Sequence, residues 1–447
     1  MKTIKIANGQ GFWGDSIEAP KKLIKSGEID YLTLDYLAEV TMSIMQKQKL
    51  KNPKAGYAKD FVELIKNVKK DIIKNNVKII ANAGGVNPLE CSREILKLFS
   101  SEEKIKIGII EGDDIFADID KLLENGADFK NMDTGQNFNV IKDKVYSANV
   151  YIDSFTISKA LNMGADIVLS GRVTDPGLAL GPMIYEFGWG KNDYNRLASG
   201  TLAGHIIECG AQCTGGNYTD WENIPDLENI GYPIINIENN GKFTVNKMKN
   251  TGGLVNRQTV SEQILYEMGD PKNYISPDVK VDFTSFNIVD NFNNSVSIDS
   301  VSGSRPTDTY KVSISYFAGY KASGQLTISG PNAIKKAKLT ADIIWKRLKS
   351  AGFKYDDTST EFLGYNSCHK DIIDLKREPN EVVLRLGVKD KSKDKVNRFG
   401  MEIAPVITSG PPGVTGFSGG RPKAQPIVAY WPTLINKKLV KTKVSII

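Results

Sequence analysis

The sequence predicts an α/β protein, with an N-terminal, mostly parallel sheet flanked by helices and a C-terminal α+β domain. In the first half, short apolar runs alternate with segments of helical periodicity, which is typical of parallel strands joined by crossover helices. In the second half, strand-like segments precede one long helix, an order that suggests a split βαβ, ferredoxin-like sandwich. At 447 residues the chain is long enough for two or three domains. We expect a boundary near Pro233, giving domains 1–233 and 234–447.

The N-terminal elements follow from hydrophobic spacing. Strands are expected at residues 3–7, 31–35, 77–81, 105–110 and 167–169, each a short, apolar, largely β-branched run. Helices are expected at residues 19–27, 40–51, 61–73, 89–99, 119–125, 155–163 and 197–213. Gly27 suits the C-terminal end of the first of these helices.

The C-terminal half has a different pattern, with several strand-like segments in succession. Strands are expected at residues 279–288, 296–301, 310–318, 322–328, 361–365, 382–386 and 401–407, with a charged, helical segment between the last two. A long helix runs from Pro331 to Ala351, since Pro331 suits a first turn and Gly352 suits an end. Segment 409–432 is rich in Gly and Pro, and we expect it to be a functional loop or an arm in a homo-oligomer.

Composition excludes several classes of protein. The chain is 40% hydrophobic and 25% charged, with a net charge of +6 that is spread along its length rather than gathered into a nucleic-acid-binding stripe. Four cysteines do not form a dense disulfide framework. The N-terminus has no apolar signal segment, and no run approaches the length of a membrane span. We expect a cytoplasmic protein with neither nucleic-acid nor membrane partners.

The first loop matches a dinucleotide fingerprint, Gly9-x-Gly11-x-x-Gly14, and Asp35 ends the next strand where a ribose-binding acid is expected. Pro20, however, places the helix start beyond the last glycine, whereas the fingerprint needs helix amides beside the pyrophosphate. We therefore favour a site loop with a stacking Trp13 and a carboxylate at Asp15 over an NAD(P)-binding loop. The alternative without a functional role is a tight turn whose aromatic residues fill a crevice between domains.

His205, Cys209 and Cys213 share one face of a predicted helix. The outer two lie about 12 Å apart along such a helix, whereas zinc ligands lie about 2.0–2.3 Å from the metal. One helix cannot place all three around one ion, so no metal site is expected and we favour small cysteines that allow close helix packing. A metal held by His205, Cys209 and a distant carboxylate stays open as the alternative. His205 and Glu208 are neighbours at a spacing of three and could act as a general acid or base, although a satisfied, buried histidine is about as plausible.

Polar residues recur where predicted strands end. Asp35, Glu111 and Asp175 each follow a strand, and parallel strands bring such residues to one edge of a sheet. Arg172 could anchor a substrate carboxylate or pair with Asp175. Glycine-rich loops, Thr214–Gly216, Thr251–Gly253 and Ser418–Arg421, offer amides to an anionic ligand. We expect catalytic roles for Asp15, Asp175, Glu208 and His205, and substrate binding by Gly11, Trp13, Gly14, Asn82, Gly84, Gly85, Asn87, Glu111, Arg172, Thr174, Gly215 and Gly216.

The chain resembles the acyclic terpene utilisation protein A (AtuA-like) family, long catalogued as a domain of unknown function. The resemblance rests on GFWGDS at 11–16, DYLAE at 35–39, NAGGVNP at 82–88, SGRVTDPGLALGP at 170–182, AGHIIECGAQCTGGN at 203–217, NTGGLV at 250–255 and RPKAQPIVAYWP at 421–432. Longer relatives carry a further small C-terminal domain. The resemblance therefore implies that whatever this further domain contributes is absent here or comes from a separate polypeptide.

The family is associated with breakdown of acyclic terpenoids and branched acids as coenzyme A thioesters, beside biotin-dependent carboxylases. The resemblance thus implies a lyase or hydratase acting on a branched acyl-CoA, with the coenzyme A thioester as substrate and no other cofactor identified. Two alternatives stay open: an NAD(P)-dependent oxidoreductase that uses the Gly9–Gly14 loop, and a non-catalytic, acyl-CoA-binding accessory subunit of a carboxylase.

Overall fold

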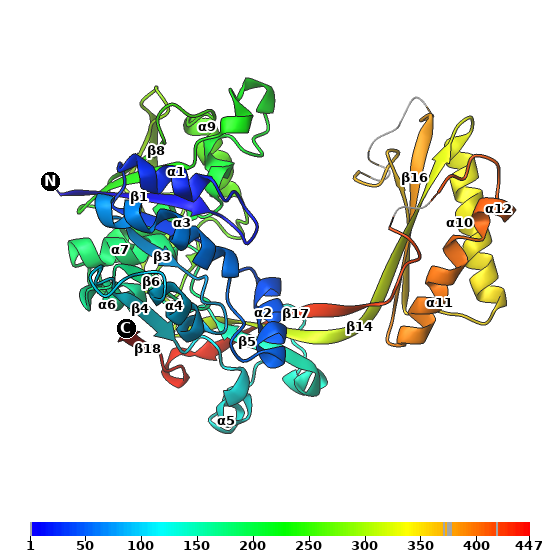
Figure 1. Ribbon diagram of the computed structural model, residues 1–447, viewed down its shortest axis with the longest axis horizontal. Helices are drawn as coiled ribbons and strands as arrows, with labels where there is room; N and C mark the ends of the chain where they lie inside the picture. Colours follow the sequence, from blue (N-terminus) through cyan, green and yellow to red (C-terminus); the bar gives the residue numbers. More distant parts are fainter. Residues whose placement is uncertain (1, 370–371, 373–377, 417–418) are drawn as a thin grey trace. The chain divides into compact units, whose positions relative to one another are not determined.

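The computed structural model of the chain describes residues 2–369, 372, 378–416 and 419–447. Its architecture is mixed α/β, with a ten-stranded sheet and two smaller sheets, so the predicted fold class is confirmed at this level. The chain forms two compact units, residues 1–315 with 430–447, and residues 316–429. Two long strands, β14 (Thr309–Ser329) and β17 (Gln425–Asn436), contain the points where the chain passes from one unit to the other (Figure 1).

The large sheet belongs to the first unit and has a parallel centre. Its strand order is β11-β12-β8-β7-β1-β2-β3-β6-β4-β18. The parallel strands are β1 (Thr3–Gln10), β2 (Tyr31–Leu34), β3 (Lys78–Ala81), β6 (Ile167–Leu169) and β4 (Ile107–Glu111). Their order brings the carboxyl ends of β2, β3, β6 and β4 to one edge of the sheet.

Antiparallel strands extend the sheet on both sides. They are β7 (Pro233–Glu238), β8 (Phe243–Lys247), β12 (Val296–Asp299), β11 (Asn287–Asp290) and β18 (Lys443–Ile446). Strand β7 begins at Pro233, where we expected a domain boundary, and pairs with β1 so that Ile235 lies opposite Ile6. The sheet therefore continues past residue 233.

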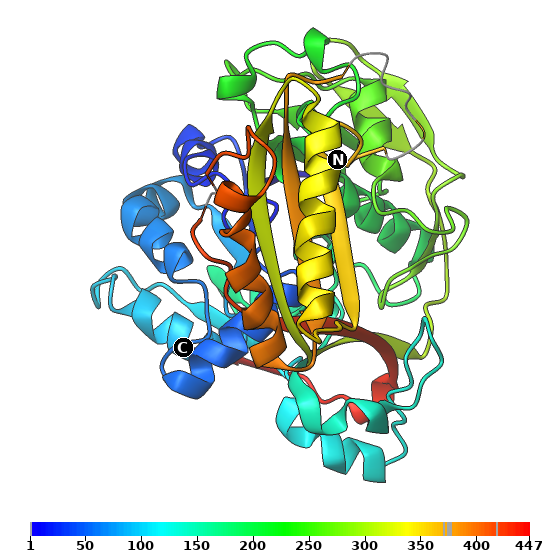
Figure 2. The same cartoon turned by 90° about the vertical axis from the view of Figure 1, so that its right-hand side faces the viewer.

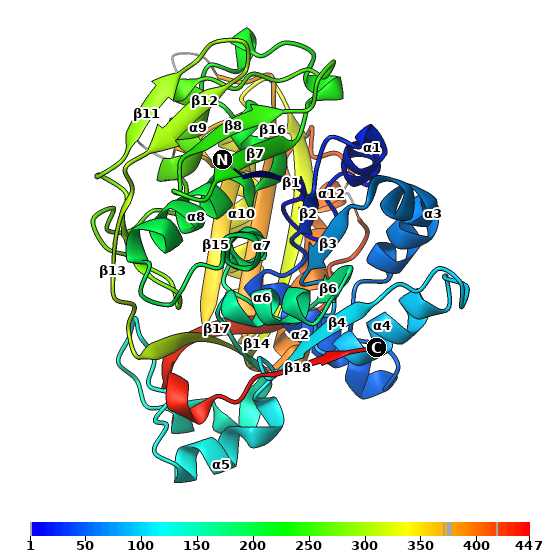
Figure 3. The same cartoon turned by 90° about the vertical axis from the view of Figure 1, so that its left-hand side faces the viewer.

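Helices cover both faces of the parallel strands (Figure 3). One face carries α1 (Ala19–Ser26), α3 (Lys59–Asn75) and α4 (Pro88–Leu96), and the other carries α6 (Phe155–Asn162), α7 (Gly177–Phe187) and α8 (Tyr194–Ile207). Further helices are α2 (Glu39–Lys51), α5 (Ile119–Glu124) and α9 (Arg257–Leu265). Parallel strands buried on both faces explain why their sequences are apolar runs rather than alternating patterns.

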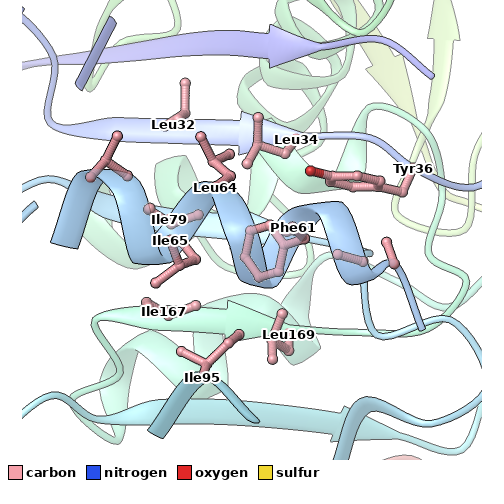
Figure 4. Close-up of a cluster of buried hydrophobic side chains, with 14 of the residues drawn as sticks. Leu32, Leu34, Tyr36, Phe61, Leu64, Ile65, Ile79, Ile95, Ile167 and Leu169 are labelled. Atoms are coloured by element: carbon pink, nitrogen blue, oxygen red, sulfur yellow. The ribbon is translucent and has the colours of Figure 1, made fainter. Parts of the chain in front are cut away.

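The core beneath α3 shows how this packing arises from sequence. The helix buries Phe61 and Ile65 completely, and these side chains lie over Leu32, Ile79 and Ile167 of the sheet (Figure 4). Phe61 and Ile65 share one face because residues four apart are neighbours on an α-helix.

The second unit follows a β-α-β-β-α-β order of β14, α10 (Ala333–Ser350), β15 (Asp357–Leu363), β16 (Glu381–Asp390), α11 (Lys393–Ile403) and β17. Its sheet order is β15-β16-β14-β17, and β16 runs antiparallel to both β15 and β14. Figure 2 shows α10 (yellow) and α11 (orange) side by side over one face of the sheet. Alternate residues of β16, such as Leu384 and Leu386, are buried on that face.

Two expectations for the C-terminal half are wrong. The strand predicted at residues 401–407 is helical, because α11 continues to Ile403 and α12 (Val406–Ser409) follows. The last strand of the second unit is instead β17, which begins inside the Gly/Pro-rich segment 409–432 that we expected to be a loop or an arm. Pro426 lacks an N–H donor, and β17 ends the strand order, where proline is tolerated.

The helix expected at residues 197–213 also ends early. Helix α8 ends at Ile207, and a 3₁₀ turn over Gly210–Thr214 follows. Gly210 has φ 59°, in the left-handed region that an α-helix cannot continue through. Strands β5 (Val145–Val150), β7 and β8 were not anticipated from the sequence.

Candidate functional site

A cavity of about 350 Å³ lies within the first unit, in a size range common for small-molecule sites. Its chemistry-bearing residues come from segments far apart in the chain: Thr174, Asp175, His205, Glu208, Tyr274 and Lys311. The first two follow strand β6, and His205 and Glu208 lie at the end of α8. Tyr274 belongs to the short strand β9 (Tyr274–Ile275), and Lys311 belongs to β14.

The loop after β6 places Asp175 at the cavity. Strand β6 is fully buried, and the loop that follows it begins with Ser170 and Gly171. The carboxylate of Asp113, which follows β4, accepts a hydrogen bond of 2.6 Å from the backbone N–H of Arg172. A Cβ on Gly171 would lie only 2.3 Å from that carboxylate, so glycine is required for this close approach.

Arg172 holds Asp175 from beneath the cavity. The Arg172 side chain is almost fully buried, and its Nη2 lies 2.6 Å from Oδ1 of Asp175. Its Nη1 donates to the carbonyl oxygen of Leu37, and its guanidinium lies 4.1 Å from the ring centroid of Tyr151. Arg172 is thus committed to the protein interior and does not line the cavity, which fits the structural pair with Asp175 better than a substrate anchor.

Helix α8 approaches this loop closely because it carries glycine at position 204. A Cβ at Gly204 would lie 2.6 Å from the carbonyl oxygen and 2.9 Å from the Cα of Pro176. The next residue along α8 is His205, and Glu208 lies one turn further. The contact between Gly204 and Pro176 therefore brings the histidine and the second carboxylate beside Asp175.

His205 and Glu208 share one proton. The Nδ1 atom of His205 lies 2.9 Å from Oε1 of Glu208, and its Nε2 lies 3.2 Å from the carbonyl oxygen of Ile264. A carbonyl oxygen can only accept, so Nε2 carries a hydrogen. The contact between Nδ1 and Oε1 then needs one further proton, held either by the imidazole or by the carboxyl group.

The second oxygen of Glu208 is unpartnered in the described part of the chain. Oε2 is buried and has no hydrogen-bond partner among the residues that the structure describes. Burial raises the pKa of Glu208 to about 7, although the neighbouring His205 acts in the opposite direction. For His205, burial lowers the pKa, but the charge and hydrogen bond of Glu208 outweigh burial and leave the pKa raised. A carboxyl group with a pKa of about 7 suits general acid–base catalysis at neutral pH.

Aromatic rings enclose this pair. The His205 ring lies 5.6 Å from that of Tyr274 and 5.5 Å from that of Phe283, and these two rings stack at 4.7 Å. Burial, together with the charges of Glu208 and Asp175, raises the pKa of Tyr274, so its phenol remains protonated and can donate a hydrogen bond.

One cation lines the same cavity. The Nζ atom of Lys311 lies 4.7 Å from the ring centroid of Tyr151, the ring that also contacts Arg172. The cavity thus combines three carboxyl groups, those of Asp175, Glu208 and Glu267, with a phenol and one ammonium group, which is a set that can move a proton on a bound substrate.

Asp35 and Asn82 support the site without lining it. They follow the neighbouring strands β2 and β3, and Nδ2 of Asn82 donates to Oδ1 of Asp35 at 2.7 Å. Burial raises the pKa of Asp35 to about 6, against the opposing charge of Arg172. Asn82 also accepts from the backbone N–H of Tyr36 at 2.6 Å, so its role in the structure is to fix these strand ends.

Asp15 turns into its own loop instead of the cavity. Its carboxylate accepts from the N–H groups of Gly11 and Ser16 at 2.9 and 2.7 Å, and from the hydroxyl of Tyr232 at 2.6 Å. An internal carboxylate therefore occupies the amides that a dinucleotide would need, and α1 begins only at Ala19. This geometry does not favour a pyrophosphate site in the Gly9–Gly14 loop.

The other expected binding residues also lie outside the cavity. The Nε1 atom of Trp13 donates to Asp60 at 3.0 Å, and Glu111 pairs with Lys443 at 3.8 Å. Asn87 donates to backbone carbonyl groups. The glycines of these loops serve close packing or turns: Gly11, Gly14, Gly84, Gly85, Gly215 and Gly216. Of the expected site residues, Thr174, Asp175, His205 and Glu208 line the cavity.

Within the described residues, no cluster of three or more His, Cys, Asp or Glu side chains could hold a metal ion. Burial raises the pKa of Cys209 to about 12, which disfavours a thiolate there. Every helix in the described residues is too short or too polar to cross a bilayer.

Several cavity residues were missed by the sequence reasoning: Tyr151, Glu267, Tyr274 and Lys311. Tyr151 and Lys311 are adjacent through a backbone hydrogen bond of 3.0 Å between segments distant in sequence. No local spacing marks any of these residues, because tertiary packing alone brings them to the cavity.

Comparison with known families gives one match. The model described as "Acyclic terpene utilisation family protein AtuA" matches residues 4–446, nearly the whole chain. No curated protein matches the sequence.

Proposed function

The chain belongs to the acyclic terpene utilisation protein A family, and we propose that it is a lyase or hydratase that acts on a branched acyl-CoA or a related carboxylated substrate in catabolism. The family description supports a role in acyclic terpene utilisation. The reaction type is the one that the family resemblance implies, and the cavity supports it because an acid–base pair and a cation lie together there.

The observation that carries the proposal is the His205–Glu208 pair. Glu208 lines the cavity, its Oε2 has no hydrogen-bond partner among the described residues, and burial raises its pKa to about 7. A group of this pKa can both accept and return a proton at neutral pH. His205 acts as a positioning residue, since its contacts with Glu208 and Ile264 fix the orientation of the carboxyl group.

In the hydration of an α,β-unsaturated thioester, the carboxylate of Glu208 removes a proton from water. The water oxygen bonds to the β-carbon, and the π electrons move towards the thioester carbonyl. The proton held by Glu208 then adds to the α-carbon, so charge and atoms balance. In the proposed arrangement, the second hydrogen of the water stays on the oxygen and is donated in a hydrogen bond to Asp175, while Arg172 keeps the Asp175 carboxylate in place.

The same residues suit the cleavage of a 3-hydroxyacyl thioester. Glu208 removes the hydroxyl proton, the bond between the α- and β-carbons breaks as a carbonyl forms, and the electron pair left on the α-carbon takes up the proton. Lys311 binds an anionic part of the substrate, and the phenol of Tyr274 donates a hydrogen bond to an oxygen that gains charge.

The test is turnover of branched 2-enoyl-CoA and 3-hydroxyacyl-CoA thioesters by the wild type, by Glu208→Gln and by Glu222→Gln. Glu222 is exposed and outside the cavity, so it controls for the loss of a carboxylate. We expect Glu208→Gln to lose about 10²- to 10⁴-fold in kcat, the usual contribution of a general base, with little change in folding. Turnover unaffected by Glu208→Gln, or binding of thioesters without any turnover by the wild type, would contradict the proposal. The second outcome would instead favour an accessory, acyl-CoA-binding role.

A further inference from the structure

The second unit has an open sheet face opposite α10 and α11. In β14, β15 and β16, one set of alternate residues packs against these helices, and the other set points to the opposite face. A cavity of about 740 Å³ lies over this open face. Its lining lies entirely within the second unit, and its volume is in the range of sites for nucleotide-sized molecules.

The floor of this cavity is one row of small residues. The strand register places Ser359, Gly387 and Ser323 opposite one another across β15, β16 and β14. A Cβ on Gly387 would lie 2.5 Å from Oγ of Ser359, so glycine keeps the centre of the row low. The row leaves two hydroxyl groups beside an open space.

Charged rows flank this floor on both sides. On one side, Asp357, Lys389 and Lys321 lie opposite one another, so two lysines are direct cross-strand neighbours. Like charges in such positions repel each other. Among the described residues, neither lysine has an ion-pair partner within 4 Å. On the other side, Arg385 and Glu361 pair at 2.5 Å and neutralise each other.

The segment after Gly420 adds two more cations to the lining, Arg421 and Lys423. Arg421 is the last residue of the glycine-rich loop Ser418–Arg421 that the sequence marked as an anion-binding candidate, of which Ser418 lies outside the described residues. The lining contains five cationic and two acidic side chains, so its formal charge is 5 − 2 = +3. A cavity of this charge, with hydroxyls on its floor, complements a phosphate-bearing molecule.

We propose that this open face of the second unit binds a nucleotide-sized molecule through its phosphate groups. Lys321 and Lys389 contact one phosphate together, which relieves their mutual repulsion, and Ser323 and Ser359 donate hydrogen bonds to it. Arg421 and Lys423 bind a second anionic group at the rim. This site is separate from the acid–base cavity of the first unit and does not depend on the function proposed for it.

The experiment is titration calorimetry of the full chain with ADP, pyrophosphate and adenosine at low ionic strength. The variants are the double change Lys321→Gln with Lys389→Gln, the steric change Gly387→Val, and the control Lys338→Gln with Lys346→Gln. The control lysines are exposed on α10, which covers the other face, and their removal changes the net charge equally. Thermal unfolding of each variant checks that the fold is retained.

We expect ADP and pyrophosphate to bind and adenosine not to bind. The Lys321/Lys389 double variant and Gly387→Val should each weaken binding at least about tenfold, a loss equivalent to one or more lost phosphate contacts. The control variant should bind as the wild type does. Tighter binding of ADP than of pyrophosphate identifies a nucleotide, and equal binding identifies the phosphate groups alone; both support the site.

Three results would overturn the proposal. The first is no binding of ADP or pyrophosphate to the wild type at about 10 mM ligand. The second is an equal loss of affinity in the control variant, which would mean that net charge alone attracts the anions. The third is binding of polyglutamate in the absence of pyrophosphate binding, which would assign this face to an acidic protein partner.

Discussion

Replacing Gly204 by alanine tests whether the approach of α8 to the loop after β6 builds the acid–base cavity. The added Cβ would lie 2.6 Å from the carbonyl oxygen of Pro176 and 2.9 Å from its Cα. Both are backbone atoms, so no side-chain rotation can relieve the overlap. The helix itself must move, and it carries His205 and Glu208 away from Asp175.

Two opposing effects set the size of the change in stability. Alanine is favoured over glycine in a helix interior by about 1 kcal/mol. Overpacking a buried position costs about 1–3 kcal/mol, and contact with two rigid backbone atoms places Gly204 at the upper end. We therefore expect Gly204→Ala to lower the free energy of unfolding by about 2 kcal/mol.

Urea unfolding of the wild type, Gly204→Ala and Gly190→Ala measures this effect. Gly190 lies just before α8, and an added Cβ there would meet only the carboxylate of Asp193, at 3.6 Å. Gly190→Ala should therefore be as stable as the wild type. If Gly204→Ala proves as stable as the wild type or more stable, the close contact does not hold the site together and the reasoning fails.

Three further predictions follow from buried groups. Arg172→Met should cost about 1–3 kcal/mol in urea unfolding, because it leaves the buried carbonyl oxygen of Leu37 without its donor and removes the ion pair with the partly exposed Asp175; an unchanged stability would contradict this role. Burial raises the pKa of Asp113 from 3.8 to about 7. Between these two pH values, Asp113 therefore holds a proton in the native state that it has lost in the unfolded chain. Stability should fall as pH rises from about 4 to 7, and Asp113→Asn should flatten this fall by about 1 kcal/mol per pH unit; parallel profiles would refute it. Phe61→Ala should cost about 3–5 kcal/mol by the same assay, and a cost near that of an exposed residue would show that α3 is not packed on the sheet.

Hydrophobic spacing predicted the parallel sheet well because both of its faces are buried. The run 167–169 is β6 to the residue, and the helix expected at 61–73 lies inside α3. The failure at β17 has a physical cause. Its strand-forming residues follow a Gly/Pro-rich segment and include Pro426, which is compatible with a strand only at a sheet edge, a property of the tertiary structure.

The acid–base residues were predictable only in part. Asp175, His205 and Glu208 belong to two segments that each carry their own signal, a strand end and a helical spacing. Asp15 had a similar signal, but its short side chain satisfies nearby amides first, as aspartate commonly does. Tyr274 and Lys311 carry no local signal, since long-range packing alone places them at the cavity.

The measurement that tests the central claim most directly is ¹⁵N NMR titration of the histidine ring nitrogens between about pH 5 and 9. The chain has only two histidines, His205 and His369, and a His369→Gln variant assigns the signals. The shared proton predicts that Nε2 of His205 stays protonated throughout, while the titration of Nδ1 is coupled to that of Glu208, whose pKa burial raises to about 7, and loses this coupling in Glu208→Gln. Titration of His205 as an isolated imidazole, unchanged by Glu208→Gln, would contradict the account.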